Sequence, residues 1–349
     1  MINNKLNIGT NYRPFIIAEM SGNHNQSLDR ALAIVDAAAK TGAQALKLQT
    51  YTADTITLNV GSGDFVIDDP KSLWNGEKLY GLYEKAHTPW EWHKAIFDRC
   101  RELGIFAFST PFDETAVDFL ESLEMPFYKI ASFESNHFPL LKKIAATGKP
   151  IIMSTGMATL SELAEAVETI RSVGKNNQLI LLKCTSAYPA SPKDANLQTI
   201  PHMRDAFGCE VGLSDHTTGI SVALAAVALG ATVIEKHFTL SRADGGVDAA
   251  FSLEPQELTS LVNESERVWQ SLGLVSYGPT ENEQDSVQFR RSMYIAKDLK
   301  PGDRLTYGDN LRIVRPGYGL APKFLPQFED RKVTKVIKAG TRVTWDLLE

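Results

Sequence analysis

The sequence is poor in cysteine and has no long apolar run. Its three cysteines, Cys100, Cys184 and Cys209, lie far apart and match no zinc-ligand or redox-motif spacing, a usage that fits the reducing cytoplasm. No apolar run reaches the roughly 18 residues that a membrane-spanning helix requires. The N-terminal segment lacks the basic and then apolar layout of a signal peptide. We therefore expect a cytoplasmic protein that has no membrane partner.

Charge of one sign is not concentrated anywhere in the chain. The net charge is −6, and acidic and basic residues are mixed throughout. Because no long basic run is present, we expect no nucleic-acid partner, although a local phosphate-binding pocket stays open. A Gly-rich fingerprint followed by an acidic residue is also missing, which disfavours a dinucleotide-binding fold.

A unit made of a helix-like stretch, a Gly or Pro turn and a short apolar run recurs along most of the 349 residues. Short apolar runs that alternate with amphipathic stretches are typical of βα units and a parallel sheet. Eight such units predict a (β/α)8 TIM barrel, and an open doubly wound sheet is the alternative. The predicted strands are 15–19, 45–49, 105–109, 127–130, 150–154, 179–184, 210–214 and 232–237.

The pattern of apolar and polar residues changes after the last of these units. Residues 276–292 are polar and resemble a linker, whereas residues 293–349 contain short β-like pieces separated by turns. The sequence therefore predicts a barrel domain over 1–275, a linker over 276–292 and a small domain with little helix over 293–349.

Ionisable and hydroxyl side chains gather where the predicted strands end, as in "VIEKHFTL" over 233–240. Chemistry in a (β/α)8 barrel lies at this end of the strands. Alternate residues of a strand share a face, so Glu235 and His237 point with Val233 into the barrel. Lys236 then points to the helix layer, where we expect an ion pair or an extended side chain.

Two histidines end neighbouring predicted strands. His216 and His237 are predicted to converge, which suggests a divalent metal with open positions, and a hydrogen-bonded histidine pair is the alternative. His24 lies in the first loop, where it is either a third imidazole of the pocket or a turn residue.

Lysines at the strand ends favour an anionic ligand. Lys47, Lys129 and Lys183 would supply charge, and short hydroxyl side chains would donate hydrogen bonds to a phosphate or carboxylate. For any single hydroxyl, capping of the next helix is the alternative. A Schiff-base aldolase that uses Lys129 or Lys183 is a second enzymatic interpretation. A glycan-binding protein with an inert barrel is disfavoured, because charges at most strand ends would then have no purpose.

The motifs "FIIAEMSGNHNQSL", "KLQTY", "FSTPFDETAVDFLE", "YKIASFE", "MSTGMAT", "LKCTSAYPA", "GLSDHT", "IEKHFTL" and "RPGYGLAP", in this order, resemble the sialic (nonulosonic) acid synthase family. The resemblance covers nearly the whole chain. It implies a barrel followed by an antifreeze-like (SAF) domain. It also implies condensation of phosphoenolpyruvate with an open-chain acetamido sugar, release of phosphate, and a divalent cation.

The resemblance also implies site residues. His216 and His237 would hold the metal, for which Mn²⁺, Mg²⁺ or Co²⁺ is suitable. Arg315 would reach the sugar in the partner subunit of a domain-swapped homodimer. The family usually has Asn where this chain has Ser186. Acid–base roles are implied for Glu19, Glu134, Glu235 and Lys129; phosphoenolpyruvate contacts for Lys47, Thr110, Lys129, Ser132, Ser154, Ser186 and Ser214; and sugar contacts for Glu19, Tyr188, Asp248 and Arg315.

Within the family, three stretches resemble the pseudaminic branch: "EMSGNHNQSL", "PWEWH" and "SRADGGVDAAFSLEP". The implied sugar is 2,4-diacetamido-2,4,6-trideoxy-L-altrose. The N-acetylneuraminate and legionaminate branches are the alternatives. Residue patterns alone do not choose a general base between Glu134 and Glu235.

Overall fold

Eight parallel strands form a closed barrel in which each strand pairs with the next and β8 pairs with β1. The computed structural model describes residues 7–70, 74–174 and 178–347, and the chain divides into two units, Met1–Gly273 and Leu274–Glu349. The predicted (β/α)8 barrel is confirmed, and the open doubly wound sheet is wrong. The barrel strands are β1 (Phe15–Glu19), β2 (Ala45–Thr50), β3 (Phe106–Pro111), β4 (Tyr128–Ile130), β5 (Ile151–Ser154), β6 (Leu179–Cys184), β7 (Glu210–Asp215) and β8 (Val233–His237).

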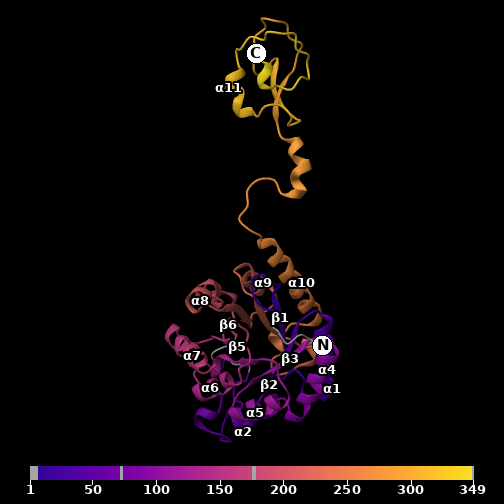
Figure 1. The fold of residues 1–349 in the computed structure, drawn as a ribbon. Helices are drawn as coiled ribbons and strands as arrows, with labels where there is room; N and C mark the ends of the chain where they lie inside the picture. The colour runs from indigo at the N-terminus through magenta and orange to yellow at the C-terminus, as the bar shows by residue number, and fades with distance from the viewer. Residues whose placement is uncertain (1–6, 71–73, 175–177, 348–349) are drawn as a thin grey trace. The chain divides into compact units, whose positions relative to one another are not determined.

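Helices surround the barrel strands (Figure 1). Several begin at residues whose side chains accept backbone hydrogen bonds, such as Asp113 before α5 and Thr159 before α7, where Glu162 completes a capping box. The helices of this unit are α1 (Leu28–Lys40), α2 (Ala53–Ile56), α3 (Leu79–Ala86), α4 (His93–Glu102), α5 (Glu114–Ser122), α6 (Phe138–Ala146), α7 (Leu160–Val173), α8 (Thr199–Phe207), α9 (Ser221–Ala228) and α10 (Pro255–Leu272).

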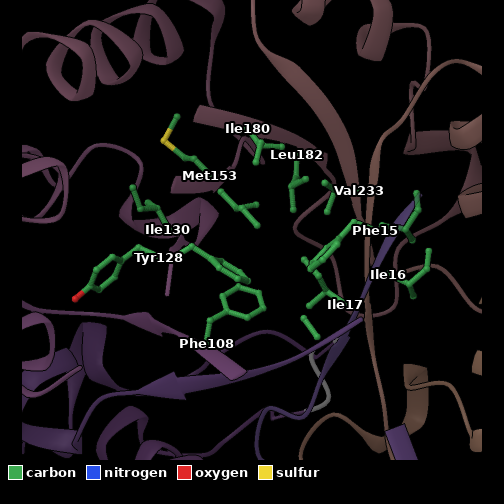
Figure 2. Packing of buried hydrophobic residues seen from close by; sticks show 14 of the residues in the cluster. Phe15, Ile16, Ile17, Phe108, Tyr128, Ile130, Met153, Ile180, Leu182 and Val233 are labelled. Carbon is green, nitrogen blue, oxygen red and sulfur yellow. The ribbon is translucent and has the colours of Figure 1, made fainter. Parts of the chain in front are cut away.

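Apolar side chains fill the interior of the barrel below its charged end. Figure 2 shows Phe15 and Phe108 pointing into the space that the strands enclose, whereas Tyr128 points away from it. The strands are buried on both faces, which is why they consist of nearly continuous apolar runs. The interior is therefore a packed core, and polar groups are confined to the ends of the strands.

The pairing of β7 with β8 settles which way the ionisable residues of "VIEKH" point. Ser214 pairs with Glu235, and Asp215 pairs with Lys236. The Nζ of Lys236 lies 2.9 Å from Oδ2 of Asp215, and both side chains are buried. The expected outward direction and ion pair of Lys236 are therefore confirmed, and Glu235 and His237 face the barrel interior.

The second unit has its own small core. Strands β9 (Ser292–Ile295) and β10 (Leu311–Val314) pair antiparallel, and α11 (Leu325–Phe328) is its single α-helix among the described residues. Residues 281–289, which fall in the segment predicted as a linker, form an exposed 3₁₀ helix. Within the described part of the chain, no helix is long and apolar enough to cross a membrane. The core consists of Met293, Ile295, Leu299, Leu305, Leu311, Phe328, Val333, Ile337, Val343 and Leu347.

Gly212 on β7 should be essential for closing the barrel. A Cβ at this position would lie 2.2 Å from the backbone oxygen of Val233 on β8. Because the strand backbone has no room to move, we expect Gly212→Ala to lower the free energy of unfolding by about 3 kcal/mol or more. Urea denaturation followed by circular dichroism measures this loss.

The matched control is Gly81→Ala in α3, where an added Cβ meets nothing within 4 Å. We expect this change to stabilise the protein by roughly 0.5–1 kcal/mol. Equal unfolding free energies for the two variants would contradict the close approach of β7 and β8.

Candidate active site

Four ionisable side chains from four strands meet in one buried layer at the carboxyl end of the barrel. The Nζ of Lys47 lies 3.2 Å from Oε2 of Glu19 and 3.1 Å from Oε1 of Glu235. The Nζ of Lys129 lies 3.9 Å from the same Oε1 of Glu235. All four side chains are almost completely inaccessible to solvent. Charges so deeply buried are retained only where they are paired, and here they form one network.

The two carboxyl groups of the network have pKa values that are shifted in opposite directions. Burial raises the pKa of Glu19 to about 7, although Lys47 opposes the rise. Burial would also raise the pKa of Glu235, but the ammonium groups of Lys129 and Lys47 outweigh it and hold that pKa below its ordinary value. Burial lowers the pKa of Lys129 to about 8. Glu235 is thus the carboxylate that stays charged, and Glu19 is the one that takes up a proton near neutral pH.

Small polar groups surround Lys129. The hydroxyl groups of Ser132, Ser154 and Ser186, here called the hydroxyl cradle, together with Lys129 are suited to bind an anion. Its Nζ lies 2.6 Å from Oγ of Ser154 and 3.1 Å from the backbone oxygen of Ile130. Nearby, the N–H of Gly156 donates to Oγ of Ser132 at 3.0 Å. A Cβ at Gly156 would lie 2.2 Å from Oγ of Ser186. The glycine is therefore needed for the hydroxyl groups of two different loops to approach one another.

His216 and His237 lie beside each other, with ring centroids 5.3 Å apart. The Nδ1 of His216 is 2.9 Å from the backbone oxygen of Thr185, so Nδ1 carries a proton and Nε2 is the ring nitrogen that could bind a cation. Burial would lower the pKa of His216, but Cys184 and the backbone oxygen of Thr185 outweigh it and raise that pKa. Burial and the nearby positive groups hold the pKa of His237 well below its ordinary value, so this imidazole is neutral. The ring of Tyr188 covers His216 at 4.4 Å. Asp248 places its Oδ2 3.6 Å from Nδ1 of His237.

This arrangement fits a divalent cation. Nδ1 of His237 and Oε2 of Glu235 are buried and have no hydrogen-bond partner. Neutral imidazoles with free lone pairs and neighbouring carboxylates are ligands that Mn²⁺ and similar ions accept. Within residues 7–70, 74–174 and 178–347, no three His, Cys, Asp or Glu side chains are grouped closely enough to hold an ion by themselves. Water or substrate would have to complete the coordination.

Glu134 lies in the turn after β4, over residues 132–134. Its Oε2 is buried without a hydrogen-bond partner, and burial raises its pKa to about 7 while Lys129 opposes the rise. A carboxyl group with a free oxygen and a pKa near neutrality is suited to move a proton.

The structure brings together most of the residues predicted for the site. Arg315 lies in the second unit, where its side chain is exposed. The expected contribution of Lys183 to the pocket is wrong, because Lys183 lies on the outer face of β6 beside Leu163 and Met203. The other residues predicted for the site lie in the first unit, near the carboxyl ends of the strands or in the loops that follow them. They are Glu19, Lys47, Thr110, Lys129, Ser132, Glu134, Ser154, Ser186, Tyr188, Ser214, His216, Glu235, His237 and Asp248.

His24 acts as a turn residue. Its Nδ1 accepts the N–H of Gln26, and its Nε2 lies 3.2 Å from Oγ1 of Thr88. Both ring nitrogens are therefore engaged within the protein.

Two residues of the site, Ser21 and Cys184, were not singled out in the sequence, whereas Gln49 is expected there because it shares a strand face with Lys47. Gln49 donates to Oε1 of Glu19 at 2.8 Å, and Ser21 hydrogen-bonds Asp248. Cys184 is the inward residue at the end of β6, because it pairs with Ser214. The alternation that places Gln49 and Glu235 inward could have found Cys184; no comparable signal marks Ser21, which lies in a loop.

Comparison with known proteins agrees with this geometry. The family model described as "NeuB family" matches residues 34–277, and the model of the SAF domain matches residues 290–349. This chain belongs to the NeuB family. The resemblance to sialic (nonulosonic) acid synthases and the expected SAF domain are therefore confirmed, and members of this family are enzymes.

Two curated relatives and one solved structure illustrate the likeness. A pseudaminic acid synthase of Campylobacter jejuni is 43% identical over 96% of both chains. An N,N'-diacetyllegionaminic acid synthase of the same bacterium is 37% identical and covers 93% of this chain and 97% of its own. The crystal structure of an N-acetylneuraminic acid synthetase from Leptospira borgpetersenii, in complex with citrate, has 34% identity and a TM-score of 0.71, covering 81% of this chain and 93% of its own.

Proposed function

We propose that this protein is a pseudaminic acid synthase. It condenses phosphoenolpyruvate with 2,4-diacetamido-2,4,6-trideoxy-L-altrose and water, and it releases pseudaminic acid and phosphate. The observation that carries the proposal is the 43% identity to a pseudaminic acid synthase over 96% of both chains. The charged layer and the hydroxyl cradle at the mouth of the barrel supply the chemistry that such a reaction needs.

The pseudaminic branch is favoured over the legionaminate branch by a comparison within one bacterium. The two Campylobacter jejuni enzymes are 43% and 37% identical to this chain. Since both come from the same organism, distance between species does not account for the difference. Legionaminate and N-acetylneuraminate synthesis are the alternatives.

Phosphoenolpyruvate would bind at the cradle. Lys47 and Lys129 supply positive charge, and charge-assisted hydrogen bonds of this kind are the strong ones for phosphate and carboxylate groups. The short hydroxyl side chains then orient the anion. They belong to Thr110, Ser132, Ser154, Ser186 and Ser214. The sugar would lie above them, against Glu19, Tyr188 and Asp248.

The reaction forms a bond between C3 of phosphoenolpyruvate and the aldehyde carbon of the sugar. The π-bond electron pair of the aldehyde moves to its oxygen, which takes up a proton and becomes a hydroxyl group, and positive charge develops at C2. Glu235, which stays ionised between two lysines, faces that charge. Water then adds at C2, and Glu134 takes its proton through the unpartnered Oε2. The tetrahedral intermediate collapses by cleavage of the bond between C2 and the phosphate oxygen; the electron pair leaves with phosphate, and the C2 hydroxyl loses its proton to become the ketone. Holding both substrates in one buried pocket lowers the entropic part of the barrier.

We infer that His216 and His237 hold a divalent cation, with Mn²⁺ preferred and Mg²⁺ or Co²⁺ acceptable. When bound, the cation supplies Lewis-acid polarisation of the aldehyde. A neutral His237 whose buried Nδ1 has no hydrogen-bond partner supports this role, and so does the nearby ring of His216.

Arg315 would contact the sugar from the SAF domain of a second copy in a domain-swapped homodimer. Its exposed guanidinium in the second unit supports this proposal, because it is free to reach a partner.

An Arg315→Ala variant should raise the KM for the sugar far more than the KM for phosphoenolpyruvate; equal effects would argue against the contact.

A panel of acetamido sugars tests the proposed reaction. Phosphate release should be fastest with phosphoenolpyruvate and the 2,4-diacetamido-L-altrose derivative, because this chain shares more identity with the pseudaminic acid synthase than with the legionaminic acid synthase of Campylobacter jejuni, and slower with N-acetylmannosamine. Borohydride serves as a control for a Schiff-base route and should trap no adduct on Lys129. Faster turnover with the legionaminate precursor would move the protein to that branch.

The role of Glu134 predicts a particular pH profile. Above about pH 8 kcat/KM should fall, because Lys129 loses the charge that binds the anion. Below that, because the pKa of Glu134 is raised to about 7, kcat/KM should increase along a limb that rises through pH 7. In Glu134→Gln this limb should vanish and kcat should fall by about 10²–10⁴-fold.

Glu19→Gln is the necessary companion variant, since the pKa of Glu19 is also raised to about 7. If the limb disappears in Glu19→Gln and survives in Glu134→Gln, the assignment of the base to Glu134 is wrong.

Metal binding can be measured without turnover. Titration calorimetry should show one Mn²⁺ per chain, and His237→Ala should abolish that binding because one of two protein nitrogens is lost. The exposed His202 provides a control, since His202→Ala should bind Mn²⁺ like the parent. Unchanged affinity in His237→Ala would remove His237 as a ligand.

A further inference from the structure

A buried ion pair lies directly behind the two histidines, on the opposite face of their strands. Lys236 precedes His237, and Asp215 precedes His216, so the alternation of strand residues sends the pair outward and the imidazoles inward. The exposed fractions of the Lys236 and Asp215 side chains are 0% and 2%. The mechanism described above makes no use of either residue.

The ion pair of Lys236 and Asp215 lies at the end of the β7–β8 ladder. Asp215 and Lys236 are the last registered partners of the two strands, and β7 ends at Asp215. His216 therefore lies one residue beyond the ladder. Strand hydrogen bonds between β7 and β8 thus do not set its distance from His237, and some other contact must do so.

The pair makes side-chain contacts with the residues on either side of His216 in the chain. Lys236 Nζ donates to Oδ2 of Asp215 at 2.9 Å and also to the backbone oxygen of Thr217. Asp215 Oδ1 accepts the N–H of Thr217 at 2.9 Å. Residues 215 and 217 are both tied to β8 through one ammonium group. The ion pair therefore holds residues 215–217 in place without contacting the imidazole of His216.

We propose that Lys236 and Asp215 are positioning residues that set the spacing of His216 and His237 for a shared divalent cation. This inference rests on the metal role in the proposed function. Groups that orient metal ligands from outside the coordination sphere are worth about 10–100-fold in metal affinity. The pair explains why a core strand carries a lysine that faces away from the pocket.

The test separates positioning from stability by comparing single and double variants. Lys236→Met alone leaves the carboxylate of Asp215 buried without its partner and should be strongly destabilised. The double variant Lys236→Met with Asp215→Asn removes both charges while keeping an acceptor for the Thr217 N–H. We expect its urea midpoint to return close to that of the parent. Its Kd for Mn²⁺, measured by electron paramagnetic resonance on the full chain, should stay about 10–100-fold weaker.

Lys149→Met is the matched control, because Lys149 pairs with Glu121 at 2.5 Å on another side of the barrel. Its Kd for Mn²⁺ should equal that of the parent. A double variant that binds Mn²⁺ like the parent would overturn the positioning role. A parent protein that binds no Mn²⁺ would instead overturn the metal proposal itself and this inference with it.

Discussion

The mouth of the barrel depends on the ammonium group of Lys47, which lies within hydrogen-bonding distance of two buried carboxylates. Without it, Glu19 and Glu235 would face each other in a space that excludes water, and both would be driven towards the neutral form. With it, one carboxylate stays ionised and can hold Lys129 in the same network. The protonation states of the site therefore follow from two ammonium groups, since Lys129 and Lys47 together keep Glu235 ionised.

Much of the fold was predictable because the physical signal repeats. Strand β6 begins and ends at the predicted residues, and β1 does as well, since a parallel strand buried on both faces is a continuous apolar run bounded by polar turns. The inward direction of Glu235 and His237 follows from alternation once one residue of the strand is known to face the barrel interior. The small second unit was predictable from residue patterns only as a region poor in helix, because its pieces are too short to carry a periodic pattern; the SAF domain was predicted by the family resemblance.

The candidate site was predictable where a residue lies on a strand and less so where it lies in a loop. Lys183 was assigned to the pocket because of its charge, although it alternates with the inward Cys184. Ser21 reaches Asp248 across 227 positions of the chain, and no local pattern announces such a contact. The distinction between Glu134 and Glu235 needed the distances to the lysines, because the same residue type acquires opposite pKa shifts from different neighbours.

The apolar layer formed by Phe15, Phe108 and Val233 lies beneath the charged layer and is separate from it. Folding can therefore rely on the lower half of the cylinder while the loops above it diverge. The segment around Tyr188 and the segment around Asp248 are accordingly open to diversification in the laboratory. On the proposed sugar contacts of Tyr188 and Asp248, libraries confined to these two loops should yield folded enzymes with altered sugar preference, and the same division of labour would let evolution produce several nonulosonic acids from one scaffold.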